Sequence, residues 1–356
     1  MYIEIVNKKS FALLLMIAVA LIGASASAIA QPKTTSQPAK AAEPASVATL
    51  RLLPRSDVVA FVNVARLLNE AVPKALADSP AKLAEFNADL DKFKSQTGID
   101  ARSFEDMAIG MLYQHPRPEI TTTDIVFIAR GSFNSNVLLA AARLASQGKY
   151  REEKYGSSTI YIFTVRDQVK MLGLLKMRVG EVAATALDSG TLVLGELSSV
   201  RATLDANKTP GRVNAELIQS ATRTPAAVMG FGANVPMAVT STADFGNPEI
   251  GKIIGSIRHA YGAISTTDSG FEMLSVARTE KPEQAQALSE TIGTLKQFGA
   301  MIVSQLPPAT GKLAQTALDN LKVSSTGNEM SLRLEIAQAD ISALMRFLQP
   351  KIADAR

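Results

Sequence analysis

Residues 326–348 have the sequence TGNEMSLRLEIAQADISALMRFL, and this stretch decides the fold class. After the turn at Thr326-Gly327-Asn328, apolar and polar residues alternate with the period of two that is typical of a half-buried strand. The apolar strand positions are Leu332, Leu334 and Ile336. Asp340 is then placed to cap a helix. The apolar helix positions follow a helical stripe and are Ile341, Leu344, Met345 and Leu348. The stretch predicts a strand, a turn before it and a helix after it.

The same order of strand, turn, strand and helix recurs elsewhere in the chain. The expected copies are strands 258–266 and 271–278 with a helix from Pro282, strands 182–187 and 191–195 with a helix over 198–206, and strand 125–130 with a helix over 134–147. In the helix from Pro282, the buried stripe is expected to be Ala285, Leu288, Ile292 and Leu295. A further hairpin over 149–165 and a helical region over 66–97 complete the pattern. Hairpins followed by helices predict an α+β fold with antiparallel sheets and helices on one face.

The N-terminus has the features of a secretory signal peptide over residues 1–30. Lys8 and Lys9 precede a twelve-residue apolar run that ends at Ile22, and Ala28-Ile29-Ala30 supplies the small residues of a cleavage site. We expect cleavage between Ala30 and Gln31, with cleavage after Ala28 as the alternative. The apolar run is about 18 Å long as a helix, which is shorter than the roughly 30 Å hydrocarbon core. An uncleaved anchor or a buried core helix is the competing interpretation. Cleavage predicts an exported protein, periplasmic or extracellular, with no permanent membrane span.

The rest of the chain is expected to contain a linker and two halves. Residues 31–48 are rich in Pro, Ala, Ser and Thr and have too little apolar surface to offset the entropy of ordering, so a disordered linker is predicted. The turn-forming sequence NKTPGR over 207–212 predicts a boundary between an α+β half over 49–209 and a second over 210–356. One continuous sheet, with this segment as a loop, is the alternative.

The composition excludes several classes of chemistry. The 356 residues include no Cys and two His, which leaves no thiol nucleophile, iron–sulfur cluster or Cys-based zinc site. A formal net charge of +4 is too small and dispersed for a nucleic-acid footprint. We therefore expect no cofactor, no metal and no nucleic-acid partner.

Three motifs suggest chemistry and each also has a structural explanation. Ser79-Pro80-Ala81-Lys82 fits the S-x-x-K of penicillin-binding enzymes, but Ser79 as a helix cap before Pro80 explains it better. Gly230-Phe231-Gly232 begins like a dinucleotide fingerprint, yet it lacks the third Gly, so close backbone packing is favoured. Gly311-Lys312 lacks the remaining residues of a phosphate loop.

The remaining polar candidates are also interpreted as structural. His115 falls in a Pro-rich loop. The alternation of the strand places His259 on one face with Tyr261, and we interpret each His as an ordinary buried or surface residue. Among acidic pairs, Glu152 and Glu153 occupy adjacent strand positions that face opposite ways, and Asp89 and Asp91 fit the exposed face of a helix. The segment 170–178, KMLGLLKMR, is too short for an interfacial membrane helix and is expected to be a strand or loop. No catalytic, cofactor or metal residue is assigned.

Four segments carry a resemblance to a class of exported bacterial proteins of unknown function. They are LRLLPRSDVVAFVNVARLL (50–68), GIDARSFEDMAIG (98–110), IVFIARGSF (125–133) and VAATALDSGTLVLGELSSVRATLD (182–205). The similarity covers roughly residues 50–207 and implies an envelope or extracellular α+β protein without catalytic residues.

Three functions remain open from the sequence. The first is a non-catalytic exported protein with a binding or envelope-assembly role, whose partner is an unidentified envelope protein or an apolar ligand. The second is a carrier of lipid or another apolar ligand in a cavity between a curved sheet and helices. The third is a Ser–Lys type hydrolase that uses Ser79 and Lys82.

Overall fold

The computed structural model describes residues 45–117, 120–164, 168–171, 175–178, 180–206, 213–236, 248–303, 305 and 308–341. The predicted signal peptide, its cleavage site at Ala30 and Gln31, and residues 31–44 of the predicted linker lie outside the described residues. The last four residues of that linker, 45–48, are not disordered but belong to helix α2 (Ala45–Leu50). This helix is ordered because its Thr49 and Leu50 are buried in the fold.

The chain divides into two compact units, and the division falls between Asn234 and Val235. Unit 1 comprises the described residues up to Leu68 together with Glu85–Asn234, and unit 2 comprises Asn69–Ala84 and the described residues from Val235 onward. The predicted boundary at 209/210 is therefore displaced toward the C-terminus. The reason is that the residues after it, over 213–234, pack in unit 1 with a strand from the start of the chain.

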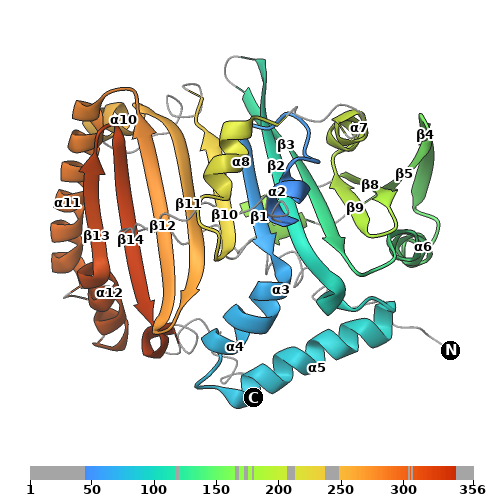
Figure 1. Cartoon of the computed structure of the whole chain (residues 1–356), viewed down its shortest axis with the longest axis horizontal. Coiled ribbons are helices and arrows are strands. Elements are labelled where there is room, and N and C mark those ends of the chain that lie inside the picture. The colour runs from blue at the N-terminus through green and yellow to red at the C-terminus, as the bar shows by residue number, and fades with distance from the viewer. Residues whose placement is uncertain are drawn as a thin grey trace, which may run out of the picture. The chain divides into compact units, whose positions relative to one another are not determined.

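Unit 1 is built on an antiparallel sheet with the strand order β10-β1-β2-β3-β9-β8-β5-β4 (Figure 1). Its strands are β1 (Val58–Asn63), β2 (Phe104–Arg117), β3 (Ile120–Gly131), β4 (Tyr150–Tyr155), β5 (Ser158–Thr164), β8 (Glu181–Asp188), β9 (Thr191–Gly195) and β10 (Ala227–Asn234). Strands β6 (Gln168–Met171) and β7 (Leu175–Arg178) pair as a separate hairpin. The helical elements within unit 1, besides α2, are α3 (Val64–Arg66), the 3-10 turn Ala101–Ser103, α6 (Ser135–Ala145), α7 (Leu197–Ala206) and α8 (Ala215–Ala221).

Helices pack on both faces of the unit 1 sheet. Leu138 and Leu139 of α6 pack against Leu192 and Leu194 of β9, whereas α7 lies beside Val126. Because Val126 pairs with Gly195 and Phe127 with Leu194, Val126 and Leu194 point to opposite faces of the sheet. The expectation that helices share one face therefore needs this correction for α6. The burial of β9 agrees with helices on both faces: its three consecutive residues Thr191 to Val193 are all buried, which is typical of a strand covered on both sides.

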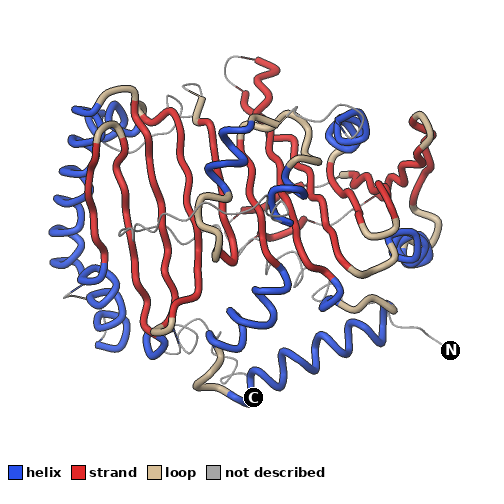
Figure 2. Tube along the Cα trace, in the orientation of Figure 1, coloured by secondary structure: helices blue, strands red, loops and turns tan. Residues whose placement is uncertain are grey.

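In unit 2 the antiparallel strands follow the order β13-β14-β12-β11. Its described elements are α4 (Val72–Ala75), α10 (Pro248–Ile254), β11 (Ile257–Thr267), β12 (Gly270–Thr279), α11 (Pro282–Val303), α12 (Pro308–Asn320), β13 (Leu321–Thr326) and β14 (Glu329–Ala337). A π-helical turn over Leu67–Ala71 and helix α5 (Pro80–Thr97) span the points where the chain passes between units. Figure 2 shows α11 as a long helix beside the strands of unit 2.

A hydrophobic cluster of unit 2 contains most of the apolar stripe that the sequence predicts for α11. Ala285 and Leu288 are buried with Ala277 and Met330, and Ile292 packs against this cluster. Leu295, the last residue of the predicted stripe, is 47% exposed because the cluster ends at Ile292. The predicted hairpin-then-helix units over 182–206, 258–303 and 125–147 are present, so the α+β class with antiparallel sheets is confirmed. Most of the helix predicted after Asp340 lies outside the described residues.

Candidate functional site

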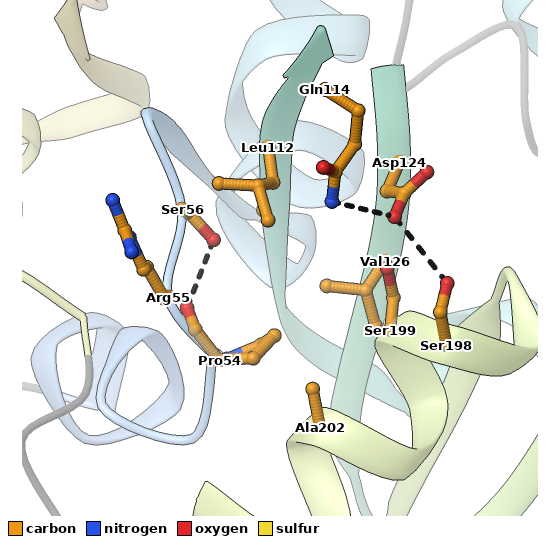
Figure 3. Close-up of a pocket in the computed structure, with 11 residues that line it drawn as sticks. Pro54, Arg55, Ser56, Leu112, Gln114, Asp124, Val126, Ser198, Ser199 and Ala202 are labelled. Carbon is orange, nitrogen blue, oxygen red and sulfur yellow. Dashed lines mark hydrogen bonds between the residues drawn. The ribbon is translucent and has the colours of Figure 1, made fainter. Parts of the chain in front are cut away.

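A pocket of about 210 Å³ lies in unit 1 between β2, β3, α7 and the segment that precedes β1 (Figure 3). Its residues combine an apolar wall with hydroxyl, amide and carboxylate groups. They are Pro54, Arg55, Ser56, Gly110, Leu112, Gln114, Asp124, Val126, Ser198, Ser199 and Ala202. We call this site the unit 1 pocket. A small concavity that joins apolar surface to a few polar groups is typical of a ligand site.

The segment before β1 is held against β2 by hydrogen bonds from and to Asp57. Its backbone N–H donates to the carbonyl oxygen of Met111 at 2.8 Å, and its carboxylate accepts from the backbone N–H of Tyr113 at 3.0 Å. Gly110 makes room at this point, because a Cβ there would lie 2.7 Å from Oγ of Ser56. The missing side chain therefore leaves space for the buried hydroxyl of Ser56, which donates to the carbonyl oxygen of Pro54 at 2.9 Å.

Helix α7 closes the other side of the pocket. The chain leaves β9 at Glu196, whose N–H donates to the carbonyl oxygen of Ile125 at 3.2 Å and whose own carbonyl accepts from the N–H of Val200 at 2.9 Å. The first bond attaches the start of the helix to β3, and the second closes its first turn. Positions three and four apart lie on one helix face, so Ser198, Ser199 and Ala202 line the pocket together.

Asp124 is the polar centre of the pocket. Its carboxylate accepts hydrogen bonds from Nε2 of Gln114 at 3.3 Å and from Oγ of Ser198 at 3.4 Å, as Figure 3 shows. Ser199 is 8% exposed, and within the described residues its hydroxyl has no hydrogen-bond partner. Its Oγ atom is accessible from the pocket, so the hydroxyl is available to a bound molecule.

Glu196 does not itself line the pocket, but its carboxyl group lies beside Asp124 and is hydrogen-bonded to it. Loss of solvent around the Glu196 carboxyl, followed by this hydrogen bond and the nearby charge of Asp124, raises the pKa of Glu196 to about 7. Two adjacent carboxylates repel each other, so one retains its proton at neutral pH.

Glu196→Gln is expected to remove a pH dependence of stability. The folded-state pKa of about 7 exceeds the ordinary value of 4.5, so the folded chain holds the extra proton between these values and its stability falls as pH rises from 4.5 to 7. Glu196 is exposed, and solvent screening limits the loss to about 1 kcal/mol. The measurement is urea unfolding of both proteins at pH 4 and pH 8. Relative to the natural protein, the free energy of unfolding of the variant should be higher at pH 8 than at pH 4 by that amount. A difference in free energy between the two proteins that stays constant with pH would contradict the assignment.

The structure does not assemble the predicted Ser–Lys motif as a nucleophile and base. The backbone carbonyl of Ser79 accepts from the N–H groups of Lys82 and Leu83 at 3.0 and 3.1 Å, and Pro80 is the first residue of α5. This is the arrangement of a helix start, as the structural explanation predicts.

The glycine motifs are also structural. A Cβ on Gly230 would lie 2.1 Å from the carbonyl oxygen of Ala221, and one on Gly232 would lie 2.6 Å from that of Leu217. The prediction of close backbone packing at these glycines is confirmed. Gly311 and Lys312 are the fourth and fifth residues of α12, so their backbone is helical and does not form a phosphate-binding loop.

The histidines and acidic pairs lie outside the unit 1 pocket. His259 is buried beside Tyr261 in β11, with ring centres 6.1 Å apart. Of the buried and surface environments that were expected, the buried one is found. The backbone at His115 belongs to β2, although a loop was expected. The pairing of β2 with β3 has a register shift between Gln114 and Arg117, where Pro116 lies.

Adjacent glutamates in β4 face opposite ways, as predicted. Glu152 pairs with Arg143 of α6, and Glu153 pairs with Arg201 of α7. Asp89 and Asp91 are exposed on α5. Of the segment 170–178, for which a strand or loop was expected, residues 170–171 belong to β6 and 175–178 to its partner β7, and residues 172–174 lie outside the described residues.

Sequence reasoning missed the carboxyl pair. Asp124 and Glu196 are separated by a hairpin, a helix and several strands along the chain. No spacing motif connects them, and Glu196 by itself looks like an ordinary acidic residue at a helix start. Only the pairing of β3 with β9 brings the two positions together.

Metal and membrane features were sought across the described parts of the chain. No group of three or more His, Cys, Asp or Glu side chains there is arranged to hold a metal ion. None of the helices described has both the length and the apolar character needed to cross a bilayer.

Comparison with known proteins finds similarity only at the level of solved structures. No family model matches the chain, and no curated protein matches it in sequence. Crystal forms I, IV and III of the protein TP0453 are similar, with TM-scores of 0.40, 0.43 and 0.41 and sequence identities of 9%, 11% and 11%. The matches cover 87%, 85% and 86% of this chain and 99%, 98% and 99% of TP0453. Scores of this size assign neither a family nor a function.

Proposed function

We propose that this chain is a non-catalytic exported protein, periplasmic or extracellular, that binds a small ligand in the unit 1 pocket. The single observation that carries the binding role is the hydroxyl of Ser199, which is open to a pocket of about 210 Å³ and has no hydrogen-bond partner among the described residues. Export rests on the features of residues 1–30.

Binding fits the pocket better than catalysis does. The hydroxyl of Ser56 donates to a backbone carbonyl, which cannot act as a general base. Ser198 donates to Asp124 at 3.4 Å, a long hydrogen bond for an activated nucleophile. The hydrolase alternative based on Ser79 gains no support, because Ser79 lies at the start of α5.

The carrier alternative also fits this pocket less well. Sites that enclose drug-sized molecules have volumes of roughly 300–1,000 Å³, and a lipid chain needs a long apolar cavity. The unit 1 pocket is smaller, and it contains a carboxylate whose burial against a hydrocarbon would be unfavourable. A small molecule with both polar and apolar parts is the better match.

Ala202→Phe is expected to abolish ligand binding, because the larger side chain enters the pocket from α7. The full chain is incubated with a small-molecule extract of the cell envelope, and bound molecules are detected by native mass spectrometry. Ala140→Phe is the matched control, since Ala140 is exposed on α6. A ligand that binds the natural protein and the control but not Ala202→Phe supports the function.

Ser199→Ala gives an independent test with little effect on packing. The hydroxyl bonds to nothing in the described protein, so its removal should leave the unfolding temperature unchanged. Affinity for the extracted ligand should fall about tenfold, the effect of one lost hydrogen bond. Absence of any ligand sensitive to Ala202→Phe and Ser199→Ala would refute the proposed function.

A further inference from the structure

We propose that the ligand of the unit 1 pocket is a small organic cation, an amine with a short apolar body, and that its ammonium group binds Asp124. This inference rests on the proposed function and specifies the chemistry of the same site. It follows from the charge at the pocket, from the shape of its wall and from the groups that would meet each end of the molecule.

The carboxylate of Asp124 in the pocket and the neighbouring carboxyl group of Glu196 have no positive counterpart among the described residues. Asp124 accepts from two neutral donors, Gln114 and Ser198, and is hydrogen-bonded to Glu196. Among the described residues, neither Asp124 nor Glu196 forms an ion pair with Lys or Arg. Arg55 also lines the pocket, but Figure 3 shows its side chain pointing away from Asp124. An incoming cation would provide the missing positive charge, whereas an anion would be repelled.

The remaining wall suits a short apolar body. Leu112 and Val126 project from the sheet toward Pro54 and Ala202 on the opposite side (Figure 3). The volume of about 210 Å³ restricts the ligand to a molecule smaller than a typical drug. The hydroxyl of Ser199 can donate to or accept from one further polar atom of that molecule.

A metal ion fits the site less well than an amine. Ca²⁺ takes six to eight oxygen ligands, and Mg²⁺ requires near-octahedral coordination. Two carboxyl groups joined by a shared proton supply too few donors. An ammonium group, by contrast, needs three acceptors at most, and the two carboxylate oxygens of Asp124 with the Ser199 hydroxyl line the pocket.

Binding of a cation should depend on the proton of Glu196. The charged group that acts on Glu196 is Asp124 from β3. Below pH 7 Glu196 is protonated, and above it the pair carries two negative charges that attract the cation. Affinity for an amine is therefore expected to rise about tenfold from pH 6 to pH 8.

The test uses the full chain and three probes of equal length: n-butylammonium, n-butanol and butyrate. Binding is followed by chemical-shift changes in NMR spectra at pH 6 and pH 8. We expect n-butylammonium to bind at least tenfold more tightly than n-butanol, with no binding of butyrate. Asp124→Asn should weaken the amine at least tenfold, whereas Asp91→Asn, a matched change at an exposed residue, should not.

Glu196→Gln separates the role of the proton from that of the charge on Asp124. This variant should still bind n-butylammonium but lose the pH dependence between pH 6 and pH 8. Equal binding of n-butanol and n-butylammonium, or an Asp124→Asn variant that folds and binds the amine normally, would overturn the inference. If an envelope ligand is lost in Ala202→Phe while n-butylammonium does not bind, the inference fails and the proposed function stands. If neither binds, both fail.

Discussion

Gly230→Ala is expected to lower the free energy of unfolding by about 3 kcal/mol, the upper range for forcing extra volume into a packed interior. Gly230 in β10 lies under the C-terminal end of α8, and it pairs with Phe61 of β1. An added Cβ would lie 2.1 Å from the carbonyl oxygen of Ala221 and 2.7 Å from a ring carbon of Phe61. Backbone cannot rotate away as a flexible side chain does, so α8 would have to move off the sheet.

The measurement for Gly230→Ala is urea unfolding followed by circular dichroism, since the chain contains no Trp. Gly180→Ala is the matched control, because Gly180 is exposed and no atom lies within 4 Å of the added Cβ. We expect the control to change the free energy of unfolding by less than about 0.5 kcal/mol. Equal effects of the two substitutions would show that α8 does not pack on β10 as described.

Leu50→Ala is the second large effect that we expect, at about 3 kcal/mol of lost stability. Leu50 is 0% exposed at the end of α2, so its removal would cost both transfer free energy and a cavity. The result would show that α2, whose first four residues fall in the predicted linker, packs into the core through Leu50.

The control for Leu50→Ala is the same substitution at Leu144, which is 81% exposed on α6. Removing an exposed Leu side chain should change stability by less than about 0.5 kcal/mol. Both variants are compared with the natural protein by urea unfolding. If Leu50→Ala is no more costly than Leu144→Ala, α2 does not contribute to the core.

Local elements could be predicted because their signals lie within a few residues of one another. The turn Asp188-Ser189-Gly190 between β8 and β9 is one example, where the carboxylate of Asp188 accepts from the N–H of Gly190 at 2.8 Å. Another is Asn134, whose side chain accepts from the N–H groups at the start of α6. Alternation and helical stripes located the paired strands and most of the buried face of α11 in the same way.

The candidate site could not be predicted in this way. Ser199 is one of many serines at helix starts, and its lack of a hydrogen-bond partner follows only from what surrounds it. No local turn explains why residue 110 is a glycine. The absence of a side chain there leaves space for the hydroxyl of Ser56. Helix α2 has six residues, too few to show a helical period.

The amino acids alone therefore specify the strands, the turns, the helix starts and the expectation of export, because each depends on neighbours along the chain. The tertiary structure decides the partners. It places β1 between β10 and β2, moves the division of the chain to Asn234, and brings Asp124 to Glu196. The physical reason is that burial of apolar surface is non-directional and can join any two segments, so the pairing of distant strands depends on the packing of the whole unit.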